Sequence, residues 1–208
     1  MKFRNGYVSN SSSSSFIVVF KKIPQGSQEM FDLMFGEDEK VINLWEDSHS
    51  TVTIAETVFR DIKHIIDDTD KTPITERYTR TGRITSEEEL GEMIARGSFD
   101  GLPPSPSRND RNRESNKLAD QARSEGVENP YQDKKWKEKI RIAEDKEWND
   151  YYERSNEAAR KIAASFWEEH KDKEILIFEY SDNDGSLFST MEHGDIFRKL
   201  PHIRVSHH

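Results

Sequence analysis

Two apolar stretches near opposite ends of the chain decide the fold: Phe16-Ile-Val-Val-Phe20 and Glu174-Ile-Leu-Ile-Phe-Glu-Tyr180. Both are short and rich in β-branched and aromatic residues, which is typical of strands that are buried on both faces. Such strands need sheet neighbours and packing layers to cover them. Because these are the two strongest strand signals in the chain, we expect them to lie side by side in one sheet.

The chain between these strands has mainly helical patterns. Apolar residues recur at helical spacing, with capping residues or glycines at the ends of the runs. Two of the helices open on capping boxes, Thr53 with Glu56 and Thr85 with Glu88. The predicted helices cover about 27–35, 53–66, 86–96, 115–125 and 130–171.

The last of these helices is long and strongly charged. At 1.5 Å per residue it spans roughly 60 Å. Its apolar residues, from Trp136 to Phe166, form a single stripe of near-heptad spacing, which indicates an antiparallel helical partner. That partner is either the 51–66 and 86–96 helices of the same chain or a second copy, so self-association through the long helix is one possibility.

After the second strand the chain is expected to turn back on itself. Ser181-Asp-Asn-Asp-Gly185 has turn chemistry, Leu187–Thr190 is the expected hairpin partner, and 202–206 forms a last strand. The predicted fold class is α+β, with a small, mainly antiparallel sheet built from N- and C-terminal strands and packed by helices. The predicted organisation is 1–100 and 173–208 as parts of one domain, 101–130 as linker and short helix, and 131–172 as the long helix.

Composition and charge exclude several classes of function. Apolar residues make up 33% of the 208 residues and charged residues 34%, which leaves material for one sizeable core. The net charge of -9 disfavours general binding to nucleic acids or anionic membranes, although 108–117 and 134–141 are locally basic. The chain has no cysteine, which fits a reducing cytosol. No apolar run approaches the roughly 20 residues of a membrane helix, and the N-terminus does not have the pattern of a signal peptide.

The serine run before the first strand is the first candidate site. Hydroxyl and backbone N–H groups can hold a phosphate, although phosphate loops usually contain glycines and precede a helix, whereas here a strand follows. A flexible polar leader is the alternative interpretation. The candidate phosphate-binding residues are Ser11, Ser12, Ser13, Ser14 and Ser15, preceded by Asn10.

A group of carboxylates and imidazoles near the C-terminus is the second candidate site. Such side chains can bind a divalent metal or serve acid–base chemistry, but Asp-Asn-Asp-Gly also makes good turns without a metal. The group contains Asp182, Asp184, Glu192, His193, Asp195, His202, His207 and His208. The candidate metal ligands are Asp182, Asp184, His193, His207 and His208.

Both ends of the chain resemble a loose family of small proteins of tailed bacteriophages and bacteria. The N-terminal signature is Asn5-Gly-Tyr-Val-Ser-Asn10, followed by the serine run and Phe16. The C-terminal segments similar to this family are Tyr180-Ser-Asp-Asn-Asp-Gly185, Glu192-His-Gly194 and Arg204-Val-Ser-His-His208. The resemblance covers roughly 50 residues and carries no settled activity. It implies a phage-type accessory protein that acts in the host cytoplasm.

Three functions fit these observations. The first is a phage-type accessory protein that binds a host or phage protein, because the chain has no Walker, dinucleotide, zincin or serine-hydrolase motif. The second is a metal-assisted enzyme acting on a phosphate-containing substrate, with the serines and the Asp/His group forming one site. The third is a structural component of the virion. The second depends on neighbours in the predicted sheet, and the third on self-association through the long helix.

Overall fold

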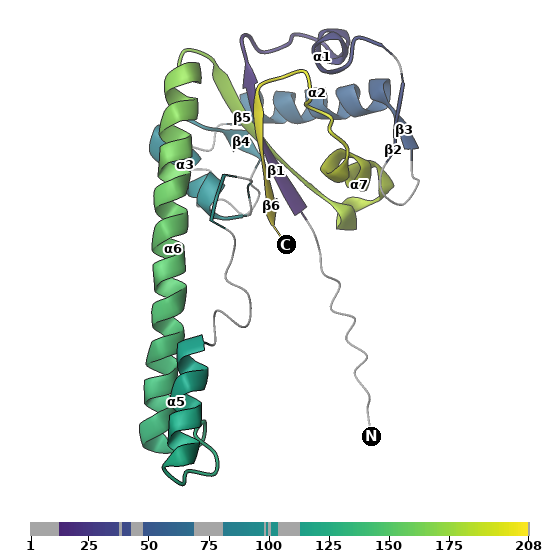
Figure 1. Ribbon diagram of the computed structural model, residues 1–208. Coiled ribbons are helices and arrows are strands. Elements are labelled where there is room, and N and C mark those ends of the chain that lie inside the picture. Colours follow the sequence, from purple (N-terminus) through teal and green to yellow (C-terminus); the bar gives the residue numbers. More distant parts are fainter. Residues whose placement is uncertain are drawn as a thin grey trace, which may run out of the picture. The chain divides into compact units, whose positions relative to one another are not determined.

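A computed structural model describes residues 13–37, 39–42, 48–68, 81–97, 99, 101–103 and 113–207. The fold is α+β, and its main sheet has the strand order β4-β5-β1-β6 with antiparallel pairing throughout (Figure 1). The four strands are β1 (Ser13–Phe20), β4 (Gly82–Arg83), β5 (Glu174–Ser181) and β6 (His202–His207). Ile17 lies opposite Ile177, so the two apolar stretches are direct neighbours, as the sequence predicts.

The strand β1 is buried on both faces because helices cover both sides of the sheet. Phe16, Val18 and Phe20 point to one face and pack in the main core with α1 (Ser27–Met34), α2 (Thr51–Asp67) and α7 (Ser186–His193). On the other side Figure 1 shows α3 (Glu87–Ala95) and the end of α6 (Lys134–His170). A minor two-stranded sheet joins β2 (Lys40–Ile42) to β3 (Ser48–Ser50).

Two helix starts differ from the predicted positions by a few residues at most. Ser50 caps α2 by accepting a hydrogen bond from the Thr53 backbone N–H, so this helix begins before the predicted Thr53. Ser86 caps α3 through the Glu89 N–H, while the Glu89 carboxylate accepts from Thr85 N–H at 2.8 Å. In both cases a serine near the predicted cap takes the capping role, three residues before Thr53 in α2 and one residue after Thr85 in α3.

The predicted hairpin strand Leu187–Thr190 is wrong, because these residues belong to the helix α7. Asp182–Asp184 form a short 3-10 helix, η2, and Gly185 then adopts a φ of 109°, which allows the chain to turn directly into α7. Leu187, Phe188 and Met191 lie on one side of this helix and pack against the main core. Their i, i+1, i+4 spacing is typical of a helix. The segment 187–190 is too short for this spacing to distinguish a helix from a strand in the sequence.

The chain divides into two compact units, residues 1–100 with 162–208 and residues 101–161. The second unit holds α5 (Arg113–Ser124) and most of α6, which form a helical hairpin (Figure 1). α6 has 37 residues, about 55 Å at 1.5 Å per residue. It begins after Asp133, whose carboxylate accepts from two backbone N–H groups, rather than at the predicted Pro130.

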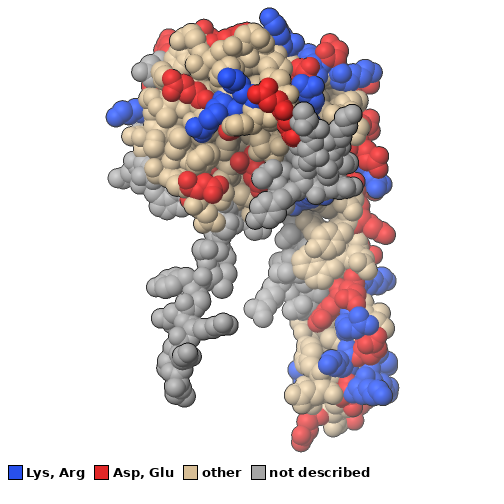
Figure 2. Space-filling model, turned by 180° about the vertical axis from the view of Figure 1, so that it is seen from behind, with Lys and Arg blue, Asp and Glu red and all other residues tan. Residues whose placement is uncertain are grey.

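The helical partner of α6 in the second unit is α5. Ala119 and Ala122 of α5 and Trp136 and Ile140 of α6 are buried there. The 51–66 segment of the predicted alternative is α2, which packs with α1 on the main core. Figure 2 shows acidic and basic side chains interleaved along the visible face of α6. Among the described helices, none is long and apolar enough to cross a membrane.

A glycine fixes how closely the end of α3 approaches β6. A Cβ atom built on Gly97 would lie 2.5 Å from Val205 Cγ1 and 2.6 Å from the Ser206 carbonyl oxygen. We expect Gly97→Ala to lower the free energy of unfolding by about 1–3 kcal/mol, because backbone must move to make room. Urea denaturation measures this loss. The matched variant Gly26→Ala has no atom within 4 Å of its new methyl group, and equal stability of the two variants would contradict the close packing.

Candidate metal centre at the end of the central sheet

Three potential metal ligands meet where β5 leaves the sheet. Asp182 is the first residue of η2, directly after β5, and Glu192 and His193 are the last two residues of α7. One ligand atom from each side chain lies within 4.8 Å of the others. The turn at Gly185 makes this possible, because it folds α7 back so that its end returns to the start of η2.

Glu192 is the most deeply buried of the three potential ligands. Its side chain is 0% exposed, and its Oε2 accepts a hydrogen bond of 2.8 Å from the Asp182 backbone N–H. Its Oε1 is buried and has no hydrogen-bond partner among the residues that the structure describes. A buried carboxylate oxygen without a partner costs free energy, and a bound cation would remove that cost.

The donor set suits a divalent cation. Two carboxylates and one imidazole combine hard oxygen ligands with a nitrogen ligand, as Mn²⁺, Fe²⁺ and Zn²⁺ accept. The His193 Nε2 atom lies 3.7 Å from Glu192 Oε2, and its side chain is 12% exposed. A protonated imidazole at this distance can pair with the carboxylate, whereas a neutral one can bind a metal. The same three residues can therefore hold either a proton or a cation.

The structure brings together some of the predicted ligands and separates others. Asp182 and His193 belong to the group, and Glu192, which was not among the predicted ligands, joins them. Asp184 is exposed on η2 and lies outside the group. His207 is on β6, where its Nε2 atom is 2.8 Å from Ser15 Oγ. His208 lies outside the described residues.

The serine run reaches the same end of the sheet. Ser13, Ser14 and Ser15 are part of β1, so the strand begins earlier than the predicted Phe16, while Ser11 and Ser12 lie outside the described residues. Ser13 is opposite Ser181, the residue before Asp182. The backbone of these serines pairs with β5 on one side and with β6 on the other, which leaves their hydroxyl groups for other contacts.

A buried tyrosine and an aspartate link β5 to α2 close to this site. Tyr180 Oη donates to Asp61 Oδ2 at 3.2 Å. Burial raises the pKa of Asp61 above its ordinary value of 3.8, while the Tyr180 hydrogen bond and the nearby Arg60 and His64 act in the opposite direction. Burial, and then the Asp61 carboxylate, raise the pKa of Tyr180 well above 10.0, so its hydroxyl stays a donor at neutral pH.

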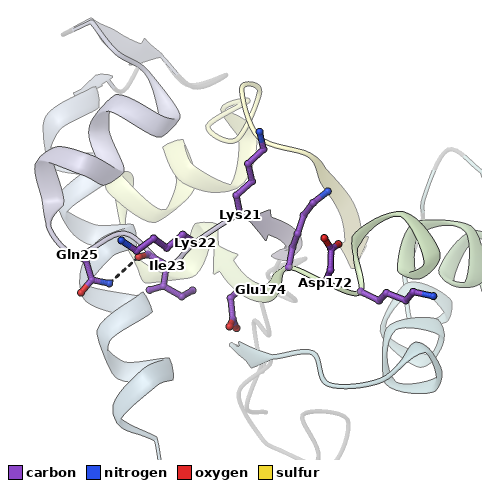
Figure 3. A pocket seen from close by; sticks show the side chains of 8 residues that line it. Lys21, Lys22, Ile23, Gln25, Asp172 and Glu174 are labelled. Atoms are coloured by element: carbon purple, nitrogen blue, oxygen red, sulfur yellow. Dashed lines mark hydrogen bonds between the residues drawn. The ribbon is translucent and has the colours of Figure 1, made fainter.

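A groove lies at the opposite end of β1 and β5. It has a volume of about 520 Å³ and is lined by Lys21, Lys22, Ile23, Gln25 and residues 171–174 (Figure 3). Lys173 Nζ contacts His170 Nδ1 at 3.1 Å, and Lys171 pairs with Glu168, so these two lysines neutralise the C-terminal end of α6. The sequence does not reveal this groove, because its lysines come from two segments that are distant along the chain.

Comparisons with protein-family models, with curated proteins and with solved structures found no match to this chain.

The raised pKa of Asp61 predicts a measurable pH dependence of stability. Between 3.8 and the higher folded-state pKa the folded protein binds more protons at Asp61 than the unfolded chain, so this group's contribution to stability falls as pH rises. Asp61→Asn removes that loss. The free energy of unfolding of this variant, relative to wild type, should therefore increase from about pH 4 upward.

Urea denaturation of both proteins across this range measures the difference. Asp67→Asn is the matched control, because Asp67 is exposed on the same helix. A difference curve for Asp61→Asn as flat as that of Asp67→Asn would contradict the burial of the Asp61 carboxyl.

Proposed function

We propose that the protein binds a divalent cation through Asp182, Glu192 and His193 and uses it in metal-assisted chemistry on a phosphate-containing substrate. The observation that carries this proposal is the buried Glu192 carboxylate, whose Oε1 has no partner among the described residues and lies beside a second carboxylate and an imidazole. A bound cation acts as a Lewis acid on phosphoryl oxygens. Three protein ligands leave coordination positions for a water and a substrate oxygen.

The residues have separate roles in this proposal. Glu192 is held by the Asp182 backbone N–H, so its carboxylate keeps a fixed position before a cation arrives. The side chains of Asp182 and His193 are less buried overall than that of Glu192. Ser14 lies close by in the sheet, because it is opposite Tyr180, two residues before Asp182. This neighbourhood supports a phosphate-containing substrate.

Metal binding is tested by calorimetry and thermal unfolding with Mn²⁺, Zn²⁺ and Mg²⁺. At a cation concentration of 100 times Kd, wild type should gain about 2.7 kcal/mol, or roughly 5–10 °C in Tm for a chain of this size. Glu192→Gln should bind at least tenfold more weakly and lose this gain, because it removes the buried charged ligand. The same variant without metal should be as stable as wild type, since it also removes a buried charge whose Oε1 has no hydrogen-bond partner among the described residues.

Asp184→Asn is the matched control, because this carboxylate is exposed and lies outside the ligand group. It should bind metal as wild type does. Hydrolysis of p-nitrophenyl phosphate esters in the presence of the bound metal tests the chemistry. If none of the three cations shifts the Tm of wild type, the proposal fails.

The second candidate function is that of a phage-type accessory protein that binds a host or phage protein in the cytoplasm. The support comes from α6, where Ile142 is 55% exposed and Tyr152 is 53% exposed. Trp148 and Tyr152 stack with ring centroids 5.5 Å apart, next to Tyr151. Exposed aromatic side chains that are already ordered are common at the centres of protein interfaces. The same surface would serve self-association in a virion component.

Affinity capture from infected cells with the double variant Ile142→Glu and Tyr152→Glu tests this candidate. A specific partner should be retained by wild type and lost by the variant. The matched control, Arg154→Glu, makes the same change in net charge at an exposed position on another face of α6 and should retain the partner. Equal capture by both variants would argue against this surface. Sedimentation of wild type separates self-association from binding to another protein.

A further inference from the structure

Arg204 is a half-buried charged residue near this end of the sheet. It lies on β6, opposite Phe16 of β1. Its Nε and Nη2 atoms are 3.4 and 3.3 Å from Ser14 Oγ, and its guanidinium carbon is 5.5 Å from the centre of the Phe16 ring. Within the described part of the chain, no carboxylate pairs with Arg204.

These contacts leave most of the binding capacity of Arg204 unused. A guanidinium has five N–H donors in a planar fork that matches a phosphate or carboxylate. Here two of them share a single hydroxyl at long distances. The chain has 40 acidic residues, and the exposed Arg198 does pair with Glu39. The Phe16 ring attracts the guanidinium through a cation–π contact but accepts none of its N–H groups in the way an oxygen anion does. The donors that Ser14 leaves unused therefore point to an anionic ligand.

The position of Arg204 places this charge near the candidate metal centre. Its guanidinium reaches Ser14, which is opposite Tyr180 on β5 and opposite Ser206 on β6. Asp182 follows two residues after Tyr180. With a strand spacing of about 4.8 Å and a rise of about 3.3 Å per residue, the backbones of Ser14 and Asp182 are roughly 8 Å apart. This is a distance that a phosphorylated small molecule can span.

We propose that Arg204, with the hydroxyl group of Ser206, binds a phosphate group of the substrate, while the buried Ser14 hydroxyl orients the guanidinium. Ser14 and Ser206 face each other across β1 and β6, on the same face of the sheet as Arg204. Phosphate fits better than a carboxylate, because its tetrahedral oxygens can accept from the guanidinium fork and from a hydroxyl group at once. That this phosphate belongs to the substrate of the metal centre rests on the proposed function; the binding of phosphate by Arg204 does not need a metal.

The test uses the full chain with a chelator present, so that the metal centre stays empty, and pyrophosphate as the probe. Calorimetry gives the affinity, and amide chemical-shift changes locate the binding. Arg204→Met keeps much of the apolar stem and removes the charge, and it should weaken binding at least tenfold. Arg204→Lys keeps the positive charge but loses the planar set of guanidinium N–H donors, and it should weaken binding less than Arg204→Met does. Arg160→Met, an exposed arginine of α6, loses the same charge and should bind as wild type does.

The outcomes separate this inference from the proposed function. Pyrophosphate binding that is unchanged in Glu192→Gln and lost in Arg204→Met supports the inference even if no metal binds. Metal binding by a wild-type protein that does not bind pyrophosphate overturns the inference and leaves the metal site in place. Equal affinities of Arg204→Met and Arg160→Met also overturn it. Malonate binding as tight as that of pyrophosphate overturns the assignment of the ligand as a phosphate.

Discussion

The pairing of β1 with β5 on one side and β6 on the other is the constraint on which the rest of the structure depends. A strand that is apolar on both faces needs two sheet neighbours and two covering layers. Both neighbours come from the last part of the chain. The residues between β1 and β5 must therefore leave the sheet and return. The helices α1, α2 and α3 cover the sheet on the way, and α5 with α6 form a separate excursion.

The antiparallel direction of this pairing also places acidic side chains at one end of β1 and β5 and lysines at the other. Because β1 and β5 are antiparallel, the start of β1 lies beside the end of β5. Ser13 and Ser14 thus become neighbours of Asp182 and of the end of α7. At the opposite end of the two strands, the same pairing gathers Lys21 and Lys22 with the lysines that follow α6. The charge pattern along the sequence shows neither group, since both are made by strand pairing.

The sequence predicts the sheet well and the candidate site only in part. The neighbours Ile17 and Ile177 follow from the composition of their strands, because only mutual burial explains two such runs. Glu192 could not be identified as a ligand, because its position beside Asp182 depends on the turn at Gly185 and on α7 being a helix. The helical spacing of Leu187, Phe188 and Met191 is the sequence signal that would have predicted α7 and, with it, the position of Glu192. Arg204 has no carboxylate partner among the described residues, and this depends on the packing around β6, which the sequence does not show.

The opposite charges of Glu192 and Arg204 are the strongest argument that this end of the sheet serves a ligand. A fold that needed only stability could have placed the two side chains in one ion pair or replaced both with apolar residues, which is often as stable. Instead each is at least partly buried, and neither pairs with the other. A cation bound by Glu192 and a phosphate bound by Arg204 would neutralise both charges, and the ligands would also attract each other. Each ligand would therefore increase the affinity of the site for the other. Such coupling between a cation and a phosphate is expected of a site for a metal-bound phosphate.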